Sequence, residues 1–110
     1  MRINTDKIIV AGDMSLATIT STVMNLEHML GFAVQAIWTG AGASGTIKLQ
    51  ASIDGITFSD IPNSAQTILG AGSFIWNMEN GKFYKYFQVV YTKTGGSTGT
   101  LNVLSNVKGL

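Results

Sequence analysis

The sequence predicts an all-β domain, an antiparallel and jelly-roll-like β-sandwich of about eight strands. Two patterns lead to this prediction: apolar and polar residues alternate over short stretches, and glycine or small polar residues interrupt the chain after runs of about 5 to 10 residues. Size is the third observation. A chain of 110 residues, 45% of them hydrophobic, supplies one core, so a single domain spanning residues 1–110 is expected.

Each strand is expected where such an alternation lies between turn residues. The clearest case is 46–52, in which Ile47 and Leu49 alternate with Lys48 and Gln50, as in a strand with one dry and one wet face. The other strands are expected at 7–11, 16–23, 32–39, 56–61, 65–69, 73–77, 83–93 and 100–107. The inward side chains that should form the core are Val34, Trp38, Ile47, Leu49, Phe58, Phe87, Val89 and Leu101.

Two shorter features complete the expected organisation. Residues 24–30 have helical character, but only enough for a turn or two. There is a weak internal sequence similarity, which we call the echo, between 45–49 and 99–103. Each segment follows an aromatic-ended strand and a glycine-rich loop. We interpret the echo as two similar hairpins, in which glycine supplies the positive φ angles that such turns require.

The charge content restricts the possible partners. Charged residues make up only 12% of the chain, the net charge is +1, and the Lys and Arg residues form no basic stripe, so no nucleic-acid partner is expected. The start of the chain, 1–13, combines charges with a short apolar run and predicts neither a signal peptide nor a membrane span. Because little charge is available to solvate two outer faces, part of the surface is expected to be shared with another subunit.

The residues that could carry chemistry are few. His28 is the only histidine and has no sequence pattern of a triad or metal site around it, so a surface or loop position is expected. Asp54 precedes Gly55 in a typical turn pair, and this loop offers one carboxylate where calcium needs several oxygen ligands. Choosing Asp54 and Asp60 as a glycosidase pair would be arbitrary. The chain is therefore not expected to be an enzyme, and no catalytic residue, cofactor or metal ligand is assigned.

The run 83–91 is apolar or aromatic on both of its faces. One face of every strand in a two-layer sandwich lies outside, so one face of this strand should contact a partner. If Phe87 and its neighbours at alternate positions point inward, the interface should contain Tyr84, Tyr86 and Val90. The partner predicted for this face is a second copy of the chain, in a closed homo-oligomer.

Two tryptophans keep an alternative function open. Trp38 and Trp76 have the ring type that stacks on sugars, which would suit a carbohydrate-binding or adhesion module. Both lie in alternating strands, where packing in the core is the more common role for tryptophan.

A resemblance gives the function a more specific form. The sequence at 31–61 resembles a recurrent type of small bacteriophage virion protein, in its Val-Gln strand, glycine-rich loop, Leu-Gln-Ala-Ser strand and Asp-Gly turn. The segments 84–91 and 98–103 resemble the same type. The resemblance implies a virion structural component, such as a capsid decoration, head-fibre or tail/adaptor protein, made in the host cytoplasm. It also implies self-association, with a trimer as the expected state, and contacts with other virion proteins. It carries no catalytic residues over to this sequence.

Overall fold

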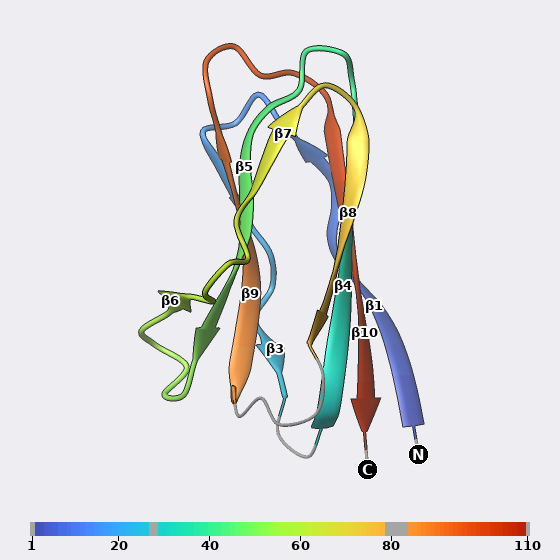
Figure 1. The fold of residues 1–110 in the computed structure, drawn as a ribbon, viewed down its shortest axis with the longest axis vertical. Coiled ribbons are helices and arrows are strands. Elements are labelled where there is room, and N and C mark those ends of the chain that lie inside the picture. Colours follow the sequence, from blue (N-terminus) through green and yellow to red (C-terminus); the bar gives the residue numbers. More distant parts are fainter. Residues whose placement is uncertain (1, 27–28, 79–83, 110) are drawn as a thin grey trace.

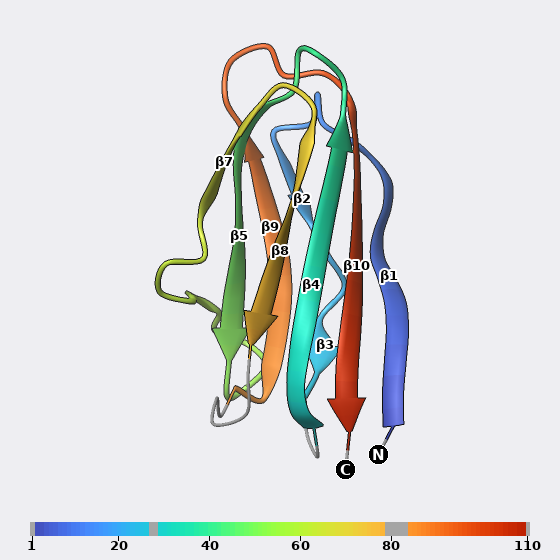
Figure 2. The ribbon, with the colours of Figure 1, turned by 45° about the vertical axis from the view of Figure 1, so that its right-hand side comes forward.

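The protein is a sandwich of two antiparallel sheets, as predicted. A computed structural model describes residues 2–26, 29–78 and 84–109, and within these residues it has ten strands and no helix. The four-stranded sheet has the order β1 (Arg2–Asp13), β10 (Thr100–Gly109), β4 (Met29–Thr39) and β8 (Gly72–Met78). Figures 1 and 2 show it as one layer beside the second sheet, with both chain ends at the same end of the molecule.

The six-stranded sheet forms the second layer. Its main order is β2 (Thr18–Thr20), β9 (Tyr86–Lys93), β5 (Ser44–Ser52) and β6 (Ser59–Asp60). Two further strands extend it: β3 (Met24–Asn25) pairs with β9, and β7 (Gln66–Leu69) pairs with β5. The long strands β5 and β9 therefore pair with each other at the centre of the sheet, and short strands line the outer side of each.

The alternation that predicted the strands also determines what they bury. In β5 and β9, buried side chains alternate with half-buried ones, and Phe87, Val89 and Tyr91 have no exposed surface. The predicted core residues are buried, with Phe58 the exception. Phe58 is half-buried because it lies in the loop before the two-residue strand β6 and not within a long strand. The ring of Phe32 from β4 stacks on Phe87 from β9 with centroids 4.3 Å apart, which joins the two layers.

Three expected elements differ in the structure. The described residues of this stretch, 24–26 and 29–30, are not helical: Met24 pairs with Phe87 in β3 and packs against the core, and β4 begins at Met29. The strand expected at 56–61 shrinks to Ser59–Asp60, because the preceding residues are held in a turn by Asp54. The strand expected at 83–93 begins at Tyr86, and residue 83 lies outside the described residues.

The echo between 45–49 and 99–103 does not mark hairpins. The chain crosses from the four-stranded to the six-stranded sheet between β4 and β5, and crosses back between β9 and β10. The two crossover loops pack against each other, and the Thr98 N–H donates to the Gly42 carbonyl at 3.2 Å. Gly99 has φ of 124°, and a Cβ there would overlap the carbonyl oxygen of Thr39. Glycine is thus required where the two loops meet. The reason is the close approach of the loops, and not a hairpin turn.

Candidate functional site

The predicted interface residues do not share one surface. Because Phe87 and the residues at alternate positions after it point into the core, Tyr86 and Val90 lie on the outer face of β9. Both are half-buried, and the Tyr86 ring lies against Gly55, where an added Cβ would be 3.2 Å from it. Tyr84 precedes the strand and packs against the core. The structure thus brings Tyr86 and Val90 to one face and separates Tyr84 from them; the interface itself stays a prediction.

A chain of polar side chains crosses the outer face of the six-stranded sheet. The Gln88 amide Nε2 donates to Gln50 Oε1 at 2.9 Å, and Gln50 Nε2 donates to Asp60 Oδ1 at 2.9 Å. Lys48 Nζ pairs with the other oxygen of Asp60 at 3.0 Å. The pKa of the Asp60 carboxyl is lowered, first by the Gln50 hydrogen bond and then by Lys48. We call these four residues the glutamine ladder, and its members satisfy one another.

A row of four threonines lies beside the glutamine ladder. Thr18 is opposite Thr92, Thr92 is opposite Thr46, and Thr46 is opposite Thr67, so one hydroxyl residue comes from each of four neighbouring strands. Threonine is well suited to a strand surface, because its branched side chain packs on its neighbours across the sheet. The threonine row therefore makes this part of the outer face uncharged and closely paired.

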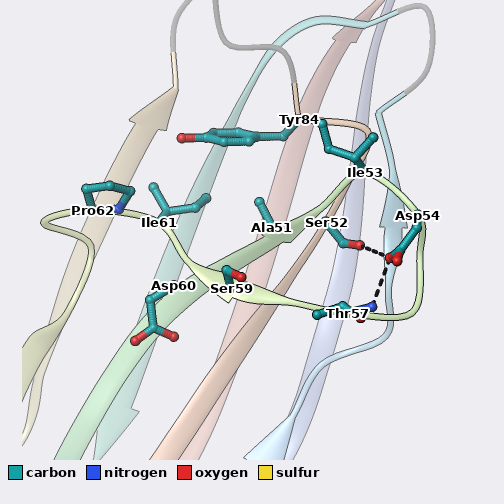
Figure 3. A pocket seen from close by; sticks show the side chains of 10 residues that line it. All are labelled: Ala51, Ser52, Ile53, Asp54, Thr57, Ser59, Asp60, Ile61, Pro62 and Tyr84. Carbon is teal, nitrogen blue, oxygen red and sulfur yellow. Dashed lines mark hydrogen bonds between the residues drawn. The ribbon is translucent and has the colours of Figure 1, made fainter.

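A pocket of about 440 Å³ opens at the end of β5, near Tyr84. Figure 3 shows the Tyr84 ring on one side and Ser59 on the opposite side, with Ala51 and Ile61 between them. The complete lining is Ala51, Ser52, Ile53, Asp54, Thr57, Ser59, Asp60, Ile61, Pro62 and Tyr84. An aromatic ring over an apolar floor, with hydroxyls and carboxylates at the rim, is an arrangement that can accept a small ligand.

The carboxylates at the pocket rim already have partners. Asp54 Oδ1 accepts hydrogen bonds from Ile56 N at 2.8 Å, Thr57 N at 2.9 Å and Ser52 Oγ at 2.9 Å, which confirms the predicted turn. The backbone N–H of Thr57 is the largest cause of the lowered pKa of Asp54. Asp60 belongs to the glutamine ladder, and its pKa is lowered too. Both carboxylates are thus engaged in hydrogen bonds, Asp54 within its own turn and Asp60 within the glutamine ladder.

The two tryptophans of the alternative function are core residues. Trp38 is 7% exposed and Trp76 is 5% exposed. The Trp76 Nε1–H donates to the carbonyl of Ser64 at 2.8 Å, and Phe74 packs edge-on against the indole at 5.1 Å. Neither ring presents a face on which a sugar could stack.

The single histidine, His28, lies outside the described residues. No group of three or more His, Cys, Asp or Glu side chains in the described part of the chain is arranged to hold a metal ion. Within 2–26, 29–78 and 84–109 there is also no helix long and apolar enough to cross a membrane.

The outer face of the four-stranded sheet is a further surface feature, which the sequence did not predict. This face is apolar or neutral over three strands, since 33–39, 72–77 and 100–106 contain no charged residue. Ile75 on β8 is 61% exposed and Ile37 on β4 is 38% exposed. The missing charges were visible in the sequence, but which strands lie together was not.

Known structures share this fold. The prophage-derived protein YomS of SPBc2 is 14% identical, with a TM-score of 0.65 and with 96% of this chain and 92% of that chain covered. A chain of Bacillus endospore appendages, described as disulfide-linked pili, is 10% identical, with a TM-score of 0.61 and coverage of 98% and 88%. The PBSX exported protein XepA is 11% identical, with a TM-score of 0.65 and coverage of 97% and 37%. No protein-family model matches the chain, and no curated protein sequence matches it. At these identities the likeness establishes a common fold.

Proposed function

We propose that this chain is a structural protein of a bacteriophage virion, acting as a capsid decoration, head-fibre or tail/adaptor component. It works by assembling with itself and by contacting other virion proteins. The observation that carries the proposal is the fold match to a prophage-derived protein over 92% of that protein's length. The sequence resemblance at 31–61 supports the same origin.

The surface chemistry supports a role in assembly. On the four-stranded sheet, 33–39, 72–77 and 100–106 contain no charged residue, and the polar groups of the glutamine ladder bond to one another. Covering neutral or internally paired groups avoids most of the desolvation cost that unpaired charges would impose. The uncharged stretches of the four-stranded sheet therefore favour burial against another protein, whereas burying the Lys48–Asp60 ion pair of the six-stranded sheet would cost desolvation free energy.

The outer face of β9 is the subunit contact predicted from the sequence. Tyr86 and Val90 supply an aromatic and a branched apolar side chain there, flanking Gln88 of the glutamine ladder. A tyrosine beside satisfied polar groups is a common anchor of protein interfaces. Tyr84 is the third residue predicted for this contact from the sequence, but it lines the pocket and packs against the core, so the proposed contact rests on Tyr86 and Val90.

The virion role can be tested on particles. Phage particles induced from the host that carries the gene, and purified by density gradient, should contain this chain when examined by mass spectrometry. Loss of the gene should remove the chain from the particle and alter particle assembly, stability or adsorption. A chain that is abundant in the lysate but absent from purified particles would contradict the proposal.

The glycan-binding alternative has its own readout. A glycan array probed with the purified protein would favour a carbohydrate-binding or adhesion module if binding were saturable and were lost in a folded Tyr84→Ala variant. Tyr84 replaces the tryptophans in this test because its ring lines the pocket, whereas Trp38 and Trp76 are buried. The virion proposal expects no such binding.

A further inference from the structure

Among the described strands, three of the four sheet edges carry features that discourage pairing with another strand. Both edges of the six-stranded sheet are made of short pieces, β2 and β3 on one side and β6 and β7 on the other, none longer than 4 residues. On the four-stranded sheet, β1 carries the charges of Asp6, Lys7 and Asp13 and has register shifts on both sides of Ile9. Short strands, edge charges and bulges are the usual protections of an exposed edge.

The fourth edge, β8, has none of these protections. It is 7 residues long, pairs with β4 in unbroken register, and has no described strand on its other side. It contains neither a charge nor a proline, and Ile75 and Phe74 are 61% and 36% exposed. A long, neutral, apolar edge of this kind is a template for another strand.

The sequence of β8 also indicates which strand fits. Its central residues read Ser73, Phe74, Ile75, Trp76, Asn77, so the chemical character is the same in both directions: polar, aromatic, aliphatic, aromatic, polar. Placed antiparallel to a copy of itself and centred on Ile75, the strand sets Ile75 opposite Ile75 on the outer face. On the inner face the same register sets Phe74 opposite Trp76, and it sets Ser73 opposite Asn77 on the outer face. Pairs of aromatic side chains that lie opposite each other on neighbouring strands stabilise an antiparallel sheet.

We propose that β8 pairs antiparallel with β8 of a second copy about a two-fold axis at Ile75, so that two four-stranded sheets become one continuous sheet. The inference rests on the self-assembly in the proposed function and adds the contact and its symmetry, a two-fold arrangement in place of the trimer that the sequence resemblance implies. An antiparallel pair of identical strands is an isologous contact, in which each copy gives and receives the same interactions. A second copy offers backbone groups that complete the hydrogen bonds of the edge, together with the same uncharged side-chain pattern.

A charge at the centre of the edge tests the contact. The parent protein should be a dimer, or a larger even-numbered assembly, by light scattering after size-exclusion chromatography at tens of micromolar. Ile75→Lys should weaken dimerisation by roughly tenfold or more, because the two introduced charges would face each other across the axis. Val10→Lys is the matched control, since Val10 is an apolar residue on the other edge of the same sheet and is 63% exposed. It should leave the assembly unchanged, and circular dichroism should show both variants folded.

Cysteine cross-linking tests the register. The chain has no cysteine of its own, so each introduced thiol reports on one position. Ile75→Cys should give covalent dimers on mild oxidation. Ser73→Cys alone should not, because its copy in the second subunit would lie roughly 13 Å away along the strand. Mixing the Ser73→Cys and Asn77→Cys proteins should restore the cross-link, because these two positions are opposite each other.

The outcomes separate this inference from the proposed function. A trimeric mass, or an assembly that withstands Ile75→Lys but dissociates on a Tyr86→Ser and Val90→Ser double change, would overturn the β8 contact and leave a self-assembling virion protein in place. Cross-linking that is strongest at Ser73→Cys alone would also overturn it. A chain found in particles but monomeric in solution refutes the β8 pairing without refuting the virion role. A chain absent from particles that still dimerises through β8 refutes the virion role alone.

Discussion

The phenolic oxygen of Tyr91 lies 2.7 Å from Oγ of Ser97, in the core at the end of the sandwich where the crossover loops meet. The same hydroxyl is 2.9 Å from the carbonyl of Met14 and 3.0 Å from that of Ser44. One buried hydroxyl therefore ties three segments together: the loop after β1, the start of β5 and the loop after β9.

Tyr91→Phe removes this hydroxyl and keeps the ring. We expect the free energy of unfolding in urea to fall by about 1 to 3 kcal/mol, because Ser97 and the carbonyls lose a buried partner. Ser97→Ala should cost a similar amount, since its Oγ also accepts the Ser44 N–H at 3.0 Å. The double variant should lose less than the sum of the two. Strict additivity would show that the two hydroxyls do not cooperate.

Leu49 is the central inward residue of β5 and has no exposed surface. Leu49→Ala should lower the free energy of unfolding by about 2 to 5 kcal/mol, because it leaves a cavity between the sheets. Leu69→Ala is the control, since Leu69 is 86% exposed. Thermal melting by circular dichroism checks both, and equal melting temperatures for the two variants would remove Leu49 from the core.

Gly99→Ala should cost at least about 2 kcal/mol, because the new Cβ would overlap the Thr39 carbonyl and its φ of 124° is strained for any other residue. Gly96→Ala, in the same loop, should have little effect because an added Cβ meets no atom within 4 Å. Urea denaturation of the two variants measures the difference. A tolerated Gly99→Ala would mean that the crossover loops do not pack this closely.

The acid sensitivity of the fold should include a contribution from Asp54. Its pKa is lowered in the folded state by the Thr57 and Ile56 N–H groups and the Ser52 hydroxyl. A lowered folded pKa gives stability that is present above the unfolded value of about 3.9 and is lost as the pH falls through the folded value. Asp54→Asn keeps an oxygen acceptor but does not titrate, so its melting temperature should fall less steeply below about pH 4. Identical pH profiles for parent and variant would contradict this.

Ser105 and Ser64 are both buried, but their hydroxyls differ. Ser105 Oγ has no hydrogen-bond partner among the described residues, whereas Ser64 Oγ accepts from Leu49 N and donates to the Leu49 carbonyl, both at 3.1 Å. Ser105→Ala should leave the free energy of unfolding unchanged or raise it by up to about 1 kcal/mol. Ser64→Ala should lower it by about 1 to 3 kcal/mol. Urea titrations that show the opposite order would mean that the Ser105 hydroxyl has a partner in solution.

Most of the architecture follows from the two-residue period. Alternation identified β5 correctly, as well as the inward side of β9, because side-chain direction in a strand is fixed by position alone. The period does not determine which sheet a strand joins, and for this reason it predicts hairpins after Thr39 and Lys93, where the chain in fact crosses between the sheets. The strand conformation of Met24 is not predictable from the sequence, because a two-residue strand is too short to show alternation and pairing with Phe87 decides its conformation.

The candidate site was predictable only in part. The outer position of Tyr86 and Val90 followed once Phe87 was assigned to the core. The position of Tyr84 could not be predicted in this way. It lies before the first residue of β9, where alternation no longer sets the direction of a side chain. The unprotected edge at β8 was not predictable at all, since an edge is a property of sheet order and not of any one segment.

The two ends of the molecule offer a practical use as a display scaffold. Arg2 pairs with Gly109, so both chain ends emerge side by side, while the crossover loops lie at the opposite end (Figure 1). At Gly95 and Gly96 an added Cβ meets nothing within 4 Å, which leaves room for a grafted epitope. A cargo fused to either terminus and a peptide inserted at this loop would point away from each other, so one face of the scaffold could be immobilised while the other is presented to a receptor.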